Sequence, residues 1–187
     1  MLDNIEPYNF KFIQKASPLD SDTFTMAFIY KFFSQSSLHS QKLKYIIRIE
    51  QFDNAYALKF YAARDRKDDN KYHKTLNIHS YKDTLRLLMT CIAVVPEILA
   101  MNDKASFVVN GANSRDLRNN TEEEKSNNQR FRIYRNIVLR KISDNLFEHY
   151  YDKESSSFML INKRSTEDCN EEAKRIIEIF SNIFDLQ

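Results

Sequence analysis

A run of basic and aromatic residues from Arg130 to Lys141 is the segment of this chain with the clearest potential for chemistry. It holds five basic residues and no acidic one. Arginine binds phosphate through paired hydrogen bonds, and aromatic rings stack on nucleic-acid bases. The segment therefore predicts contact with an anion or a single-stranded nucleic acid, through Arg130, Arg132, Tyr134 and Arg135.

The same residues also fit a packing role. Phe131, Tyr134 and Val138 fall on one face of a helix, which is typical of a core helix whose arginines are solvated or paired with acidic residues. Alternation of Phe131 and Ile133 between arginines fits a strand instead. The sequence leaves helix and strand open for residues 130–141. Packing explains the apolar positions better than stacking does.

His149 is the one candidate for catalysis. A histidine can act as general base in a metal-independent ribonuclease, with Arg132 or Arg135 stabilising the phosphate charge. A half-exposed strand histidine is the commoner reason for such a residue. His73 and His79 are two ligands at most, fewer than a zinc site needs. No metal and no cofactor are predicted.

Glycine is nearly absent, and this excludes whole classes of binding site. Gly111 is the single glycine of the chain, whereas Walker loops and dinucleotide-binding fingerprints need several. The net charge of +2, from 28 basic and 26 acidic residues, commits the protein to no particular partner. A nucleic-acid site must therefore come from local clustering of charge.

Length and cysteine content favour a single intracellular domain. A chain of 187 residues is of ordinary domain size, so we expect one domain over residues 1–187. Cys91 and Cys169 do not form a disulfide framework, and residues 1–10 lack a signal-peptide pattern. The apolar stretch Leu85–Leu99 is short and interrupted by charge. We expect a cytoplasmic protein without membrane association.

Strands dominate the first half of the predicted fold. Apolar and polar residues alternate over Lys42–Glu50 and again over Ala55–Ala62, and Asp53-Asn54 between them is typical of a turn. This pattern predicts a hairpin. Three further strands are expected, at Tyr8–Phe12, at Phe24–Phe33 and, more weakly, around Leu76 and Ile78.

Helices enter after residue 80. Ser80 and Asp83 have the spacing of a capping box, and Pro96 should kink or divide the helix that they begin. A polar stretch at about 112–128 predicts a mobile loop. The other expected elements are strands at Ala105–Asn110, Leu146–Tyr151 and Phe158–Asn162 and a C-terminal amphipathic helix. The order predicts an α+β fold: a mainly antiparallel meander packed against two or three helices.

Short motifs in the second half resemble those of a family of uncharacterised bacterial proteins. The strand Phe107–Gly111, then Ser114-Arg115, then Arg130–Tyr134 match a pattern of strand, Gly-Ser and Arg-x-Arg-Leu-Tyr opening a helix. The aromatic segment Asn54–Phe60 and the late strand Phe158–Arg164 also match. The chain departs from the pattern in the Asn- and Glu-rich insertion before Arg130 and in Ile133, where the family has Leu.

The resemblance implies a structural unit and no activity, because none is established for the family. Gly111, Arg115, Arg132 and Tyr134 would lie together where the strand ends and the helix begins. Amide groups at a helix N-terminus favour an anion, so the arginines are expected to converge there.

Two function classes remain, and an enzyme is a distant third. The preferred interpretation is a non-enzymatic bacterial interaction module, such as the partner, inhibitor or immunity component of a defence or toxin-type system. The alternative is a single-stranded nucleic-acid-binding protein that uses residues 130–141, and the distant alternative is a metal-independent ribonuclease. A surplus of Phe and Tyr beyond the needs of the core would favour a dimer.

Overall fold

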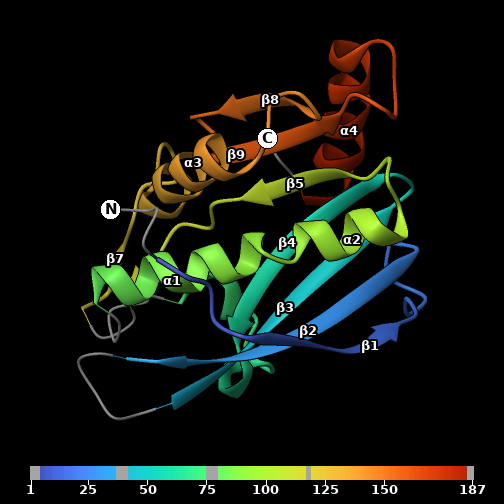
Figure 1. Ribbon diagram of the computed structural model, residues 1–187. Helices are drawn as coiled ribbons and strands as arrows, with labels where there is room; N and C mark the ends of the chain where they lie inside the picture. Colours follow the sequence, from blue (N-terminus) through green and yellow to red (C-terminus); the bar gives the residue numbers. More distant parts are fainter. Residues whose placement is uncertain (1–4, 37–41, 75–79, 117–118, 185–187) are drawn as a thin grey trace.

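A seven-stranded sheet organises the molecule, in the strand order β1-β2-β3-β4-β5-β9-β8 (Figure 1). The structure, a computed structural model, describes residues 5–36, 42–74, 80–116 and 119–184. The strands of this sheet are β1 (Phe10–Ala16), β2 (Met26–Gln35), β3 (Lys42–Phe52), β4 (Ala55–Ala62), β5 (Ser106–Asn110), β8 (Phe147–Asp152) and β9 (Ser157–Asn162). The α+β prediction with a mainly antiparallel sheet is confirmed.

The first four strands form the expected meander. The predicted hairpin is β3 and β4, and its register pairs Ile47 with Phe60 and Phe52 with Ala55. Asp53 adopts φ 52° at the turn, a left-handed conformation that aspartate tolerates better than most residues. The weaker strand expected around Leu76 and Ile78 lies outside the described residues.

Two helices in tandem connect β4 to β5. They are α1 (Tyr81–Ile92) and α2 (Val95–Met101), preceded by the 3₁₀ turns η2 (Ala63–Asp65) and η3 (Lys71–His73). The predicted capping box of Ser80 and Asp83 is confirmed. Pro96 lies at the start of α2, where the predicted helix divides into α1 and α2. Because a crossover returns the chain to the same end of the sheet, β5 runs parallel to β4.

By length and composition alone, the stretch Tyr81–Met101 could cross a membrane. More than half of its most apolar window is buried, however, and Leu87, Leu88 and Ile98 are completely enclosed. The core helix of a water-soluble protein has the same composition. The stretch therefore gives no support to a membrane location.

The segment that the sequence left open is a helix. It is α3 (Gln129–Lys141), and its N-cap is Asn128. The polar stretch ahead of it, predicted as a loop, contains two short paired strands, β6 (Arg115–Asp116) and β7 (Thr121–Glu122). Its mobility stays a prediction. The last helix is α4 (Cys169–Phe184), as expected.

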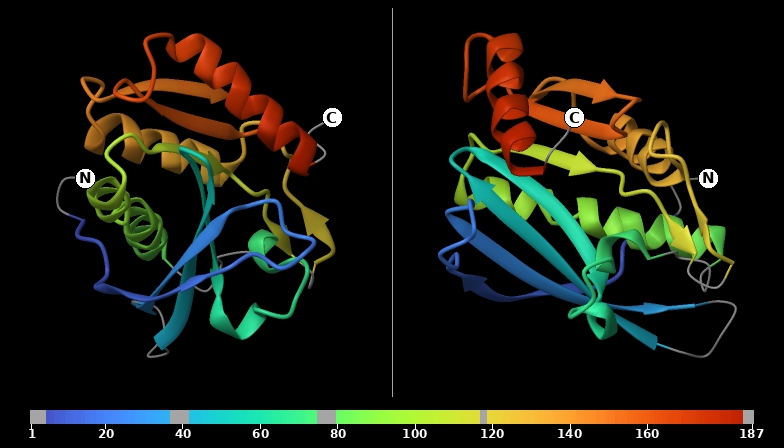
Figure 2. Two further views of the ribbon diagram at one scale, coloured as in Figure 1. Left: turned by 90° about the vertical axis from the view of Figure 1, so that its right-hand side faces the viewer. Right: turned by 180° about the vertical axis from the view of Figure 1, so that it is seen from behind.

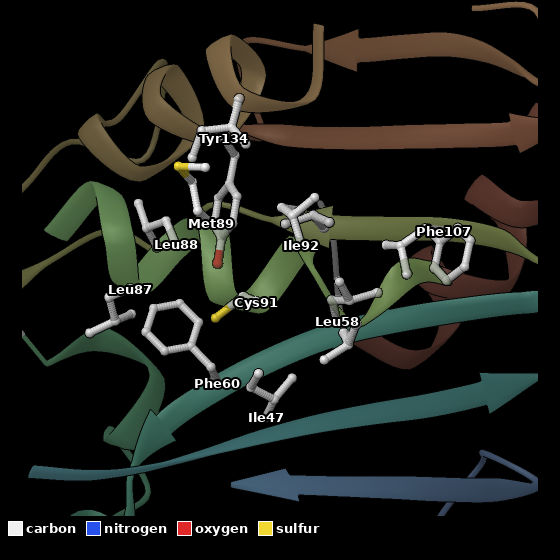
Figure 3. Packing of buried hydrophobic residues seen from close by; sticks show 14 of the residues in the cluster. Ile47, Leu58, Phe60, Leu87, Leu88, Met89, Cys91, Ile92, Phe107 and Tyr134 are labelled. Atoms are coloured by element: carbon white, nitrogen blue, oxygen red, sulfur yellow. The ribbon is translucent and has the colours of Figure 1, made fainter. Parts of the chain in front are cut away.

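Helices cover the two sides of the sheet unequally (Figure 2). On one side, called here the closed face, α1, α2 and α3 bury a large core of aromatic and aliphatic side chains, part of which Figure 3 shows. On the other side, called here the open face, α4 packs on a smaller apolar cluster that includes Phe52, Ala57 and Phe180. The rest of the open face, over β2 to β4, carries Lys31, Phe33, Lys44, Ile46, Arg48, Glu50, Lys59 and Tyr61.

Candidate functional site

A cavity lies where β4 and β5 separate. Their pairing ends at Leu58 and Val109, after which β4 continues to Ala62 while β5 ends at Asn110 and the chain turns away at Gly111. Figure 1 shows the two strands starting side by side and diverging. The space between them has a volume of about 250 Å³. Carboxyl ends of parallel strands with diverging connections are a common place for ligand sites in α/β sheets.

The lining of this cavity is apolar below and basic around it. Apolar walls come from both faces of the sheet, because the gap passes between the strands, and they include Leu58, Phe60, Val108 and Phe180. The basic lining residues are Lys59, His73, Lys125 and Arg130, and Tyr72 and Tyr134 add phenol groups. Within the described part of the chain, no aspartate or glutamate lines it.

Arg130 is the least usual of these residues because its charge is buried. Its side chain leaves the first turn of α3 and donates hydrogen bonds to the carbonyls of Tyr72 and Lys74. The guanidinium lies 5.6 Å from the ring centre of Phe60. Burial lowers the pKa of Arg130, although a guanidinium stays protonated at any ordinary pH. The cavity wall therefore carries a permanent positive charge.

No carboxylate forms an ion pair with Arg130 among the described residues, and its Nε has no hydrogen-bond partner there. A buried charge costs several kcal/mol, roughly, unless a counter-charge or hydrogen bonds compensate it. The two carbonyls offset part of that cost. Glu123 is the acidic group that acts on it through space.

Helical periodicity explains why Arg130 points inward. It shares the buried stripe of α3 with Ile133, Tyr134, Ile137 and Val138. Tyr134 itself is 4% exposed, and its hydroxyl donates a hydrogen bond to the thiol of Cys91 on α1 (Figure 3). Burial raises the pKa of both groups. Tyr134 therefore belongs mainly to the core and presents no ring for stacking.

Gly111 allows β5 and α3 to come close together. A Cβ on this residue would stand 2.8 Å from the backbone nitrogen of Phe131 and 2.9 Å from Oδ1 of Asn128. Asn128 uses that oxygen to accept the Phe131 amide at 2.9 Å, and its own side-chain amide donates to the Gly111 carbonyl. The strand–helix junction implied by the family resemblance therefore exists.

The anion at this junction is the protein's own. One carboxylate oxygen of Glu123 accepts the Gln129 amide at 2.6 Å, and the other accepts the Ser114 amide at 3.1 Å. Together with Asn128, Glu123 caps the first turn of α3. The N-terminus of this helix is thus occupied from within the chain, and it leaves no vacant amide cluster for a bound anion.

The arginines expected to converge there are dispersed. Arg115 forms an ion pair with Glu122 at 2.9 Å, on the short sheet of β6 and β7. Arg132 is exposed and donates to the Asn127 carbonyl at 2.5 Å. The guanidinium carbon of Arg135 lies 4.2 Å from the ring centre of Tyr151 on β8. These arginines and Arg130 therefore do not form one site.

His149 lies on β8, beneath α3. Its ring meets Phe158 edge to face at 5.9 Å, and its Nε2 is buried without a partner among the described residues. Burial lowers the pKa of the imidazole. A base that takes a proton from a substrate must reach it, and this nitrogen does not face solvent. In the described chain, no three His, Cys, Asp or Glu side chains cluster as metal ligands would.

The open face of the sheet carries a second basic surface. Strand register aligns Lys31, Ile46 and Tyr61 in one row across β2, β3 and β4, with Phe33 and Lys44 in the next row. The 3₁₀ turn η3 adds Lys71, whose ammonium lies 5.8 Å from the ring of Tyr61 and 5.2 Å from that of Tyr72. We call this set the basic-aromatic surface: Lys31, Phe33, Lys44, Tyr61, Lys71 and Tyr72.

Within β2, β3 and β4, Glu50 is the one acidic residue on the open face, and it is neutralised. Glu50 receives Arg48 at 2.6 Å and Lys59 at 2.5 Å, and its side chain is 9% exposed. Two cations against one carboxylate leave the cluster net positive. The row of Glu50 thus adds to the positive potential of the basic-aromatic surface next to it.

A groove runs beside α4 on the same face. It is lined by residues of β8, β9 and α4, has a volume of about 580 Å³ and shares Lys125 and Phe180 with the cavity. Tyr151 and Ile177 line the groove and are 48% and 50% exposed.

The chain matches no family model, and no curated protein or solved structure is similar to it. The resemblance to the bacterial family therefore stays a prediction. Sequence reasoning singled out Arg130 and considered His73 only as a zinc ligand, but it missed Lys59 and Lys125, which come from separate segments. Only the pairing of β4 with β5 brings them together.

Proposed function

We propose that this protein binds single-stranded nucleic acid across the open face of its sheet. The observation that supports it most is the basic-aromatic surface, in which Lys31, Phe33 and Lys44 lie beside Tyr61 on three hydrogen-bonded strands. Lysines neutralise backbone phosphates, and rings on a flat sheet stack with unpaired bases. The proposal keeps the class of ligand that residues 130–141 suggested and moves it to a different surface.

Segment 130–141 contributes little to this proposal. Arg130 and Tyr134 are buried, and Arg135 is stacked on Tyr151. Of the site arginines on α3, Arg132 alone is fully exposed. By contrast, Phe33 is 53% exposed, and Lys44 is exposed beside it.

A salt series with matched lysine variants tests the proposal. Binding of a labelled oligonucleotide is measured by fluorescence anisotropy for the wild type and for a Lys31→Ala/Lys44→Ala/Lys71→Ala variant. Each lost phosphate contact should lower the slope of log K against log salt by about 0.7, so the triple change should lower it by about 2.

The control is Lys82→Ala/Lys104→Ala/Lys153→Ala, which removes the same charge from exposed positions elsewhere. We expect this control to keep most of the wild-type slope. Phe33→Ala should weaken binding by about 1–3 kcal/mol through lost stacking, at unchanged slope. Absence of binding at low salt, or equal slopes for the two triple variants, would refute the proposal.

We propose docking of a partner protein as the second candidate, which keeps the interaction interpretation of the sequence. The groove beside α4 supports it, because Ile177 leaves apolar area exposed that an apolar segment of a partner would cover. A photo-crosslinking amino acid at position 177 should then join the protein to one partner in cells, whereas the same amino acid at position 104 should not. Equal labelling from both positions would contradict it.

A further inference from the structure

We infer that the cavity between β4 and β5 binds a phosphate monoester, carried on the end of the nucleic-acid strand that the open face holds. The inference rests on the proposed function and deepens it, because it assigns a preference for a phosphorylated terminus. Four observations support it: the charge of the lining, the donors that are free, the size of the space and its place beside the basic-aromatic surface.

Charge is the first observation. Arg130 contributes a buried positive charge that no described carboxylate pairs, and the other lining residues that can carry a positive charge are Lys59, His73 and Lys125. Lys59 is already compensated by Glu50. Because a low-dielectric wall strengthens the field of an unpaired cation, an anion in this space gains more than it would at the surface. A dianion fits this lining better than a neutral group.

Free hydrogen-bond donors are the second observation. The two Nη atoms of Arg130 are committed to carbonyls, so this residue supplies charge rather than a contact. Lys125 lies at the mouth, and no interaction of its ammonium is found in the described structure. His73 donates through Nδ1 to the side-chain oxygen of Asn113 at 2.9 Å, so its Nε2 serves a phosphate as a donor in the imidazolium form. Lysine and histidine together suit phosphate oxygens.

Size is the third observation. A volume of about 250 Å³ lies below the range of roughly 300–1,000 Å³ that is usual for drug-sized ligands. The cavity therefore takes a phosphate with the sugar that carries it, and not a dinucleotide. Phe60 and Val108 provide apolar wall for the carbon skeleton.

Location is the fourth observation. Lys59 lines the cavity and also lies on the open face, where Tyr72 neighbours it at 5.9 Å from ammonium to ring centre. Tyr72 belongs to both the basic-aromatic surface and the cavity lining. A strand that lies across β2 to β4 can thus end in the cavity. An internal phosphodiester, which carries one charge and continues on both sides, fits a space of about 250 Å³ less well.

The experiment compares strand ends. Three oligonucleotides of one sequence, labelled internally, carry a 5′-phosphate, a 3′-phosphate or hydroxyls at both ends, and anisotropy gives their affinities. One phosphorylated form should bind the wild type about tenfold or more tightly than the hydroxyl form, since charge-assisted hydrogen bonds to a dianion are gained. Lys125→Met should remove most of that advantage and leave the hydroxyl form nearly unaffected.

Two further variants keep the result interpretable. Lys153→Met removes a charge of the same kind from the exposed β8–β9 turn and should preserve the preference. His73→Asn keeps a donor where Nδ1 stands and removes Nε2, so it should reduce the preference without loss of folding. Lys125 holds other residues through its carbonyl, which the Lys125→Met change retains.

The outcomes separate this inference from the proposed function. Equal affinity for all three ends overturns the terminal phosphate site and leaves strand binding intact. If no oligonucleotide binds, the proposed function fails, and thermal unfolding with a nucleoside monophosphate and with inorganic phosphate then decides. A rise in Tm for the wild type that Lys125→Met abolishes would assign the cavity to a free phosphate monoester. No rise would overturn the inference.

Discussion

The two faces of the sheet are built from the same alternating strands and have opposite characters. The closed face buries Tyr30, Phe32 and Phe107 under three helices, and no charge lies among its central residues. The open face has one helix over part of its area, and Glu50 is held there between two cations. Because apolar and polar residues alternate along the strands, one face forms the core that stabilises the fold, and the other face stays accessible to solvent or a ligand.

The cavity between β4 and β5 connects the two faces of the sheet, because residues of both faces line it. Arg130 enters it from the side of α3, whereas Lys59 enters it from the open face. A charge that would be costly in the closed core lies at its border instead. The comparison therefore predicts large stability effects on the closed face, smaller ones on the open face and intermediate ones at their junction.

Phe107→Ala should give the largest loss of stability. The ring is fully buried between Tyr56 and Phe147, with centroid distances of 5.9 and 6.0 Å. Truncation should lower the free energy of unfolding by about 3–5 kcal/mol, measured by urea denaturation. Phe33→Ala, on the open face, should stay within about 0.5 kcal/mol of the wild type. Comparable losses for the two variants would abolish the distinction between the faces.

Gly111→Ala tests the junction. A methyl group there overlaps the backbone of Phe131, so β5 and α3 must move apart, at a cost of about 1–3 kcal/mol. Asn110→Ala, one residue earlier and exposed, is the control and should be nearly neutral. Heat denaturation followed by circular dichroism measures both. If Gly111→Ala unfolds like the control, the close approach of strand and helix is not required.

Glu50→Gln should have a smaller effect, because its partners can regain water. Arg48 and Lys59 are 24% and 22% exposed in their side chains, so the loss should be about 1–2 kcal/mol by urea denaturation. Glu171→Gln breaks an exposed pair with Lys174 and should change nothing measurable. A loss as large as that of Phe107→Ala would show that the open face also supports the fold.

His149 should make the smallest contribution, and it should depend on pH. Its folded-state pKa is lowered by burial, so the unfolded chain binds the proton more readily. Stability from this residue is present at pH 7.5 and is lost as the pH falls below about 6.5, the value of a free histidine. His149→Gln should therefore lose less Tm than the wild type between pH 7.5 and 5.5. Identical pH profiles would refute a buried neutral imidazole.

Local patterns in the sequence were sufficient for most elements. Alternation and the Asp53-Asn54 turn located the hairpin of β3 and β4, and the spacing of Ser80 and Asp83 located the start of α1. Each of these features depends on residues close together in the chain. The orientation of Arg130 was also readable, since it falls on the apolar stripe of α3, but an arginine is usually assigned to the solvated side.

The site could not be predicted, because it depends on contacts between distant residues. Nothing near β5 shows that it pairs with β4 in parallel, and only that pairing places Lys59 beside Lys125 and His73. The sequence also did not predict that Glu123 caps the N-terminus of α3, because this glutamate lies six residues before Gln129 and outside the usual spacing of a cap. Patterns among neighbouring residues predict the separate elements of such a site, but they do not predict that these elements come together.

The parallel pairing of β4 and β5 also has a consequence for the order in which the chain acquires its structure. Strands β1 to β4 pair with sequence neighbours, whereas residues 55 and 106 must find each other across a long intervening segment. Closing a large loop is slow compared with forming hairpins, and the N-terminal half leaves the ribosome first. The meander of β1 to β4 should therefore form early, before β5 pairs with β4. The cavity would be complete only after the segment with Phe180 had been made, so a shorter nascent chain could not form the proposed phosphate site.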